Sequence, residues 1–130
     1  MKSLLWQSDC SDIHWPTLSQ LYFEAGMGNK DSDALATAFS NSKEVCFVFS
    51  ESTLIAAGRV LADGAYCAIV CDIAVHPDYQ GQGIGSQILA GLKEKVADHK
   101  RTILFSRAGK EGFYEKHGFV ANPNFMVIYK

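Results

Sequence analysis

Nothing in the 130-residue sequence approaches the length of apolar run that a transmembrane helix needs. The N-terminus, Met1 to Trp6, turns polar too soon for a signal peptide. An excess of charge of one sign is also absent, because 12 basic and 14 acidic residues leave a net charge of -2. The sequence therefore predicts no membrane partner and no nucleic-acid partner, since neither would be broadly attracted. We expect a cytoplasmic protein.

Cysteine is scarce, and its spacing fits neither a disulfide framework nor a metal site. Of the four cysteines, Cys46, Cys67 and Cys71 lie in apolar strand-like runs. With no sign of an oxidising compartment, we interpret these residues as buried, reduced thiols. Cys67 and Cys71 lack the C-x-x-C spacing of a structural zinc site, and no histidine pair nearby completes one. The sequence therefore implies no metal.

The composition that is present, with 48% hydrophobic and 20% charged residues, is typical of one soluble globular domain. A chain of this length can bury a substantial core, so we expect a single domain over residues 1–130. The spacing of apolar residues predicts a mixed α/β (α+β) order, β-α-α-β-β-β-α-β-α-β-β. Strands are expected at residues 3–7, 44–50, 53–61, 66–75, 102–106, 119–121 and 125–129. Helices are expected at residues 15–26, 31–40, 84–96 and 109–117.

A glycine-rich segment between the strand at 66–75 and the helix at 84–96 carries most of the functional information. Gly81, Gly83 and Gly85 leave the main chain bare just before a helix N-terminus, where N–H groups and the helix dipole favour an anion such as phosphate. The alternative is a tight turn in which glycine only supplies unusual φ and ψ angles. Three glycines within five residues exceed the needs of a turn, so we predict a phosphate-binding loop.

The spacing narrows the kind of phosphate ligand. The segment has neither the G-x-G-x-x-G fingerprint of dinucleotide sites nor the Gly-Lys-Ser/Thr ending of a P-loop. Its pattern, Gln80-x-x-Gly83-x-Gly85, resembles the pyrophosphate loop of the GNAT superfamily of N-acetyltransferases. Residues 73–77 resemble the hydrophobic-x-Val-x-Pro strand end of that family, and residues 112–119 resemble its Phe-Tyr-x-Lys-x-Gly-Phe signature.

This resemblance implies the GNAT fold across the whole chain, with a mixed central sheet of about six to seven strands flanked by about four helices. It further implies transfer of an acetyl group from acetyl-CoA to a primary amine by direct attack in a ternary complex. A small-molecule amine is the expected acceptor, and a protein amine is the alternative. Relatives often dimerise, so the resemblance also suggests a homodimer, with the C-terminal strand pair as one interface.

The resemblance also implies which residues would bind acetyl-CoA. The strand end would contribute main-chain N–H groups to pantetheine and to the thioester carbonyl, and the glycine loop would hold the pyrophosphate. These residues are Ile73, Ala74, Val75, Gln80, Gly81, Gln82, Gly83, Ile84, Gly85 and Ser86. A non-catalytic acyl-CoA-binding module would carry the same loop and is the competing interpretation.

Two residues are predicted to be catalytic. By its place in the Phe-Tyr pair, Tyr114 would protonate the CoA thiolate, since a phenol with a pKa near ~10 is protonated at neutral pH. Core packing is its alternative role. Asp72 interrupts an apolar strand, and a buried unpaired carboxylate is costly. It could accept a proton through water or orient a cationic amine; equally, it could be a structural carboxylate paired with Arg59. Glu24 is a weaker candidate base.

Other polar and aromatic residues are interpreted mainly as structural. His76 and His117 could act as bases, but a loop before proline and a helix end favour structural roles. The aromatic residues of the N-terminal part could line an acceptor pocket, although core packing is the simpler interpretation. They are Trp6, Trp15, Tyr22 and Phe23.

One feature departs from the family pattern. Many relatives carry an asparagine that hydrogen-bonds the cofactor just after the fifth main strand, whereas this chain reads Ser106-Arg107-Ala108-Gly109-Lys110. Ser106 could replace the asparagine, or Arg107 or Lys110 could reach a phosphate. The predicted thioester side of the site therefore depends on fewer residues than the predicted pyrophosphate loop.

Overall fold

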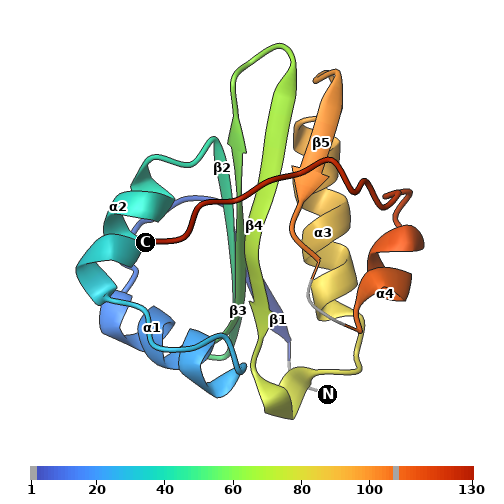
Figure 1. Ribbon diagram of the computed structural model, residues 1–130. Helices are drawn as coiled ribbons and strands as arrows, with labels where there is room; N and C mark the ends of the chain where they lie inside the picture. Colours follow the sequence, from blue (N-terminus) through green and yellow to red (C-terminus); the bar gives the residue numbers. More distant parts are fainter. Residues whose placement is uncertain (1–2, 107–108) are drawn as a thin grey trace.

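The computed structural model describes residues 3–106 and 109–130, and in them a mixed sheet separates two layers of helices (Figure 1). The described residues form five strands in the spatial order β1-β2-β3-β4-β5. The strands are β1 (Leu4–Gln7), β2 (Glu44–Ser50), β3 (Thr53–Ala62), β4 (Cys67–Val75) and β5 (Arg101–Leu104). The first four strands pair antiparallel, and β5 pairs parallel to β4. The mixed α/β class predicted from the sequence is confirmed.

The helices cover both faces of the sheet. α1 (Trp15–Glu24) and α2 (Ser32–Ser40) lie on one face, and α3 (Ile84–Lys95) and α4 (Glu111–Glu115) lie on the other (Figure 1). A short 3-10 helix, η1 (Pro77–Tyr79), lies between β4 and the glycine loop. Asp31 caps α2, because its carboxylate accepts a hydrogen bond from the Ala34 N–H at 2.9 Å.

Each face of the sheet has its own apolar core. On the α1–α2 face, Tyr22, Phe39 and Phe47 are buried together, and the Phe39 and Phe47 rings stack with centroids 5.2 Å apart. On the opposite face, Ile88 and Leu89 of α3 pack against the sheet. Burying a side chain of this size contributes roughly 1.5–3 kcal/mol, so the two cores fix both helical layers to the strands.

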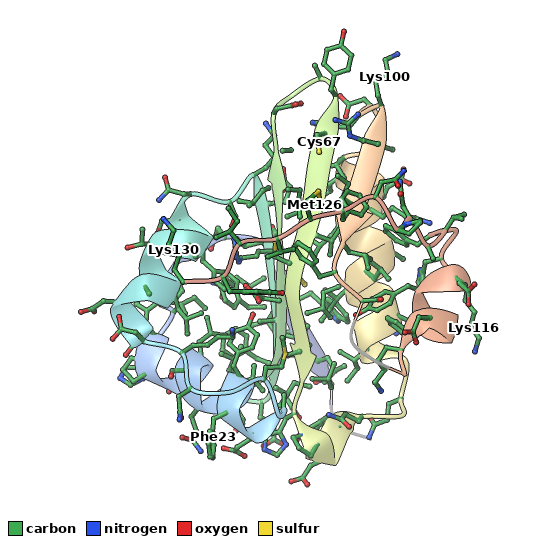
Figure 2. All side chains as sticks on the ribbon, viewed as in Figure 1. Phe23, Cys67, Lys100, Lys116, Met126 and Lys130 are labelled. Atoms are coloured by element: carbon green, nitrogen blue, oxygen red, sulfur yellow. The ribbon has the colours of Figure 1, made fainter. Side chains whose placement is uncertain are left out.

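The expected number of strands, six to seven, is wrong, because the two strands predicted at residues 119–121 and 125–129 do not form. Residues 119–130, all of them described, form neither helix nor strand. Apolar alternation there indicates only a tendency to be extended, whereas a strand also needs a hydrogen-bonding neighbour, and an isolated pair is only marginally stable. Val120, Met126 and Tyr129 are 87–95% exposed, and Met126 lies on the stretch that crosses in front of the sheet in Figure 2.

The four cysteines are free thiols, and Cys46, Cys67 and Cys71, which were predicted to be buried, are partly exposed. Burial still raises the pKa of Cys46 to about 11, so its thiol is protonated at neutral pH. Among the described residues, no helix has both the length and the apolar character needed to cross a bilayer.

Gly58 marks a close approach between β3 and α3 and yields a test of this packing. A Cβ at Gly58 would lie 2.9 Å from Ile88 Cγ2 and 3.1 Å from Ile73 Cγ1. We expect Gly58→Ala to lower the free energy of unfolding by about 1–3 kcal/mol, because the added methyl group overpacks this contact. Urea denaturation measures the change.

Gly91 provides the matched control, because it lies in α3, the helix that Gly58 approaches. A Cβ at Gly91 would meet nothing within 4 Å. Gly91→Ala should raise the free energy of unfolding by about 0.5–1 kcal/mol, because glycine is unfavourable in a helix interior. Equal effects of the two substitutions would contradict the close approach at Gly58.

Candidate active site

The glycine loop opens α3 in a conformation that favours glycine. Gly81 and Gly83 have φ angles of 78° and 84°, and Gly83 is the N-cap of α3. Because a Cβ at either position would meet nothing within 4 Å, the constraint is conformational rather than steric crowding. The first N–H groups of α3 have no partner within the helix, so they are available to an anion. This conformation is compatible with a phosphate site, which stays a prediction.

Two of the predicted cofactor residues also brace the loop. The Gln80 side-chain amide donates a hydrogen bond to the Val75 carbonyl at 2.9 Å, which ties the loop to the end of β4. Ser86 Oγ lies 2.7 Å from His117 Nε2, which ties the start of α3 to the segment after α4. Lys93 Nζ also donates to the His117 carbonyl at 2.8 Å. These contacts hold α4 beside the glycine loop.

A pocket of about 380 Å³ brings most of the predicted residues together. Its lining from β4, η1, the glycine loop and the start of α3 comprises Ile73, Ala74, Val75, Tyr79, Gln80, Gly81, Gly83, Ile84, Gly85 and Ser86. Tyr114 and Phe113 line it from α4, and Ala25 lines it from the end of α1. Asp72 and Gln82 are not among the described lining residues. Tyr114 and the glycine loop thus line one pocket.

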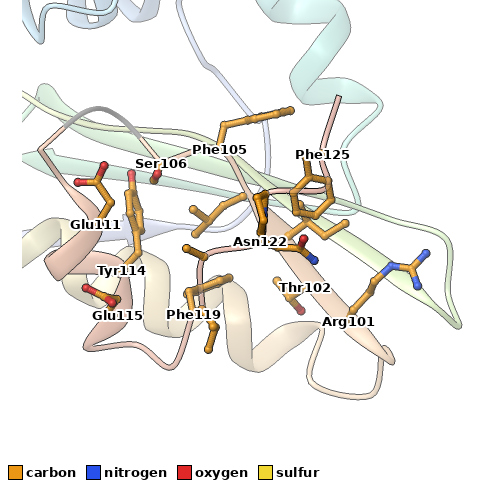
Figure 3. A pocket seen from close by; sticks show the side chains of 15 residues that line it. Arg101, Thr102, Phe105, Ser106, Glu111, Tyr114, Glu115, Phe119, Asn122 and Phe125 are labelled. Carbon is orange, nitrogen blue, oxygen red and sulfur yellow. The ribbon is translucent and has the colours of Figure 1, made fainter. Parts of the chain in front are cut away.

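Lys110 also lines the pocket and brings a basic side chain to it. Arg107 and Ala108 lie outside the described residues. Ser106 lines a second cavity of about 740 Å³ between β5, α4 and the C-terminal segment. Figure 3 shows this cavity with Tyr114 on its α4 side and Phe125 on its C-terminal side. Tyr114 therefore lies between two cavities.

The main chain of β4 becomes available to a ligand where its pairing with β5 ends. The parallel ladder runs from Cys67↔Arg101 to Val70↔Leu104 and stops there, while β4 continues to Val75. Of the residues beyond the ladder, Ile73, Ala74 and Val75 line the pocket together with Tyr114. A thioester carbonyl placed beside these N–H groups would be held by preorganised donors, as acyl transfer requires.

Asp72 pairs with Arg59, the structural alternative to a catalytic role. Its Oδ2 lies 2.9 Å from Arg59 Nε, and its Oδ1 lies 4.0 Å from Lys30 Nζ. The Asp72 side chain is 24% exposed. The geometry thus fits the structural interpretation, and a proton-accepting role for Asp72 stays a prediction.

Glu24 and the two predicted structural histidines are also engaged. His76 Nδ1 accepts a hydrogen bond from the Asp78 N–H at 3.1 Å, so its Nε2 carries the proton that is donated to Glu24 Oε2 at 2.7 Å. Hydrogen bonds from Gln20 and then from His76 lower the pKa of Glu24. The Glu24 carboxylate is therefore ionised and already paired.

Local patterns did not indicate every lining residue. Ala25 and Tyr79 reach the pocket from the end of α1 and from η1, and neither belongs to a motif. Among residues 3–106 and 109–130, no group of three His, Cys, Asp or Glu residues could hold a metal ion.

Comparison with known proteins gives a consistent class. A family model described as an acetyltransferase (GNAT) domain matches residues 42–121, which include β4, the glycine loop and Tyr114. An uncharacterized N-acetyltransferase from Pyropia yezoensis is 25% identical over 92% of this chain and 72% of its own length. A probable acetyltransferase from methicillin-resistant Staphylococcus aureus superposes with a TM-score of 0.87 at 25% identity, covering 98% of both chains.

Other similar proteins bear names that mention ligands. A predicted acetyltransferase from Clostridium acetobutylicum, solved with acetyl-CoA, has a TM-score of 0.76 at 14% identity over 98% of this chain and 96% of its own. A histone acetyltransferase from Glycine max and a serotonin N-acetyltransferase from Oryza sativa are 29% and 28% identical, and this chain spans 56% of each.

The fold and the pocket together define an acyltransferase. With the family model matching more than half of its length, the chain belongs to the GNAT acetyltransferase family.

Proposed function

We propose that this protein transfers an acetyl group from acetyl-CoA to a primary amine by direct attack in a ternary complex. The observation that carries the proposal is the single pocket in which the glycine loop, the end of β4 and Tyr114 meet. The loop supplies N–H groups for the pyrophosphate, and β4 supplies N–H groups for the thioester carbonyl. Acetyl-CoA, when bound, supplies the activated acyl group.

Each residue then has a stated task in the reaction. The amine attacks in its neutral form, and the main-chain donors of β4 stabilise the negative charge that develops on the carbonyl oxygen. As the C–S bond breaks, the Tyr114 hydroxyl donates its proton to the departing thiolate. The described lining of this pocket contains no carboxylate, and we assign removal of the amine proton to water, with Asp72 and Glu24 as the alternatives.

The acceptor is best assigned as a small-molecule amine, with a protein amine as the alternative. Among the relatives, one is named for serotonin and one for histone, so both classes of acceptor occur on related chains. The net charge of -2 is compatible with a cationic amine of either kind. A free-thiol release assay over a panel of small amines and lysine peptides separates the two classes. The expected cytoplasmic location stays a prediction.

The glycine loop is tested by Gly83→Ala. A left-handed conformation costs a non-glycine residue about 1–2 kcal/mol. Because the alanine of this variant must adopt this conformation when CoA binds, we expect the affinity for CoA to fall about tenfold. Gly64→Ala is the control, because Gly64 has a similar φ of 87° in the turn between β3 and β4. Calorimetric titration with CoA measures both variants, and equal losses would contradict a phosphate role for the loop.

Proton donation is tested by Tyr114→Phe, which removes only the hydroxyl. We expect kcat to fall about 10²-fold while the Kd for CoA is unchanged, because general acid catalysis contributes at least this much. Tyr66→Phe is the control, since Tyr66 is 64% exposed and lies outside the lining of the pocket. A parent protein that binds CoA but acetylates no amine in the panel would instead support the non-catalytic acyl-CoA-binding module.

We further propose that the protein is a homodimer joined through its C-terminal segment, residues 119–130. Met126 and Ile128 are 95% and 87% exposed, which is unfavourable for apolar side chains in water. Light scattering after gel filtration should give twice the 14.3 kDa monomer mass, and Met126→Ser with Ile128→Ser should restore the monomer. A monomeric parent protein at high concentration would overturn this assembly.

A further inference from the structure

The last part of β4 contains a bulge that is centred on Asp72. Between the partner pairs Arg59↔Cys71 and Ala57↔Ala74, β4 advances three residues while β3 advances two. Asp72 occupies this extra position with a φ of 56°. A residue with a side chain loses about 1–2 kcal/mol in that left-handed region, so other contacts must hold it there.

Tyr22 of α1 holds the main chain of the bulge. Its hydroxyl donates a hydrogen bond to the Asp72 carbonyl at 2.6 Å, and its side chain is completely buried. Burial, and next the negative charge of Asp72, raise the pKa of Tyr22 well above its usual value. The phenol is therefore a permanent donor across the pH range of an assay.

Arg59 of β3 holds the side chain of the same residue. Its Nε lies 2.9 Å from Asp72 Oδ2, and its own position is fixed by Ser42 Oγ at 3.4 Å and by the ring of Phe39 at 5.8 Å. Lys30 Nζ lies 4.0 Å from the other carboxylate oxygen. Asp72 is thus held at its carbonyl by α1 and at its carboxylate by β3.

The bulge lies directly before the part of β4 that lines the pocket. Pairing with β5 ends at Val70, the bulge follows at Asp72, and Ile73, Ala74 and Val75 line the pocket with Tyr114. A bulge bends its strand and redirects the residues next to it. The left-handed conformation of Asp72 therefore sets the direction of the N–H groups that follow it.

We propose that Tyr22 and Arg59 are positioning residues that hold Asp72 in the bulge and so aim the β4 N–H groups at the thioester carbonyl. Neither residue is among the described lining of the pocket, so both act through Asp72. The inference rests on the proposed acetyl transfer. It assigns Asp72 a conformational role in place of the predicted proton transfer.

Three substitutions of Asp72 separate these roles. Glycine and asparagine accept a left-handed φ more readily than alanine does. If the conformation of Asp72 matters, Asp72→Gly and Asp72→Asn should retain kcat and the pH profile of the parent. Asp72→Ala should lose at least about tenfold in kcat. This loss should be smaller than the ~10²–10³-fold loss that follows removal of an oxyanion donor. If Asp72 accepts a proton, all three variants should lose kcat alike and change the pH profile, which would overturn the proposal.

The role of Tyr22 is tested by Tyr22→Phe and by its rescue. Tyr22→Phe should lower kcat about tenfold with the KM for acetyl-CoA unchanged, because the glycine loop is intact while the N–H donors are misaligned. Adding Asp72→Gly to Tyr22→Phe should restore kcat, since glycine keeps the bulge without the phenol. The proposal would be overturned if Asp72→Gly did not restore the kcat that Tyr22→Phe loses, at a temperature where both variants are folded.

A second readout does not depend on turnover. On addition of acetyl-CoA, the amide resonances of residues 73–75 should shift in the parent and in Asp72→Gly, and much less in Tyr22→Phe. If the parent acetylates no amine, the proposed transfer fails, yet these shifts still decide whether Tyr22 and Asp72 set the N–H groups. Equal shifts in all three proteins would overturn the positioning role alone.

Discussion

The unequal hydrogen bonding of β4 is the constraint on which the site depends. β4 pairs with β3 along most of its nine residues, but its ladder with β5 covers only four pairs. The unpaired part of the strand would be costly to bury without a partner, and it borders a pocket that admits one. In the proposed reaction, a ligand with acceptor groups would complete the sheet at this edge. The glycine loop and α4 are arranged around that edge, so their roles follow from it.

Much of this arrangement could be predicted from sequence because it is encoded by local patterns. The spacing of Gln80, Gly83 and Gly85 specifies a loop conformation within a few residues of chain, and the apolar stripe of α3 specifies the face that it buries. Tyr114 was identified by its place in a motif. The structure then shows it beside the loop, which the motif alone does not establish.

The parts that sequence did not predict depend on contacts between distant segments. Asp72 was recognised as an unusual residue, but its left-handed conformation results from Tyr22, fifty positions earlier in the chain, and from β3. The last two strands were predicted from alternation, yet pairing also requires an edge that can receive them. In each case the missing information is tertiary.

α1 has two connections to the pocket, which limits how the helix can change. Ala25, directly after its last turn, lines the pocket, and Tyr22, one turn earlier, contacts the β4 bulge. A shift or rotation of α1 that enlarges the pocket for a bulkier amine also pulls on the Asp72 carbonyl. If the proposed roles hold, substrate range and reaction rate would therefore change together in this chain. A change of acceptor by remodelling α1 requires a compensating change at position 72, for which glycine is the simplest solution.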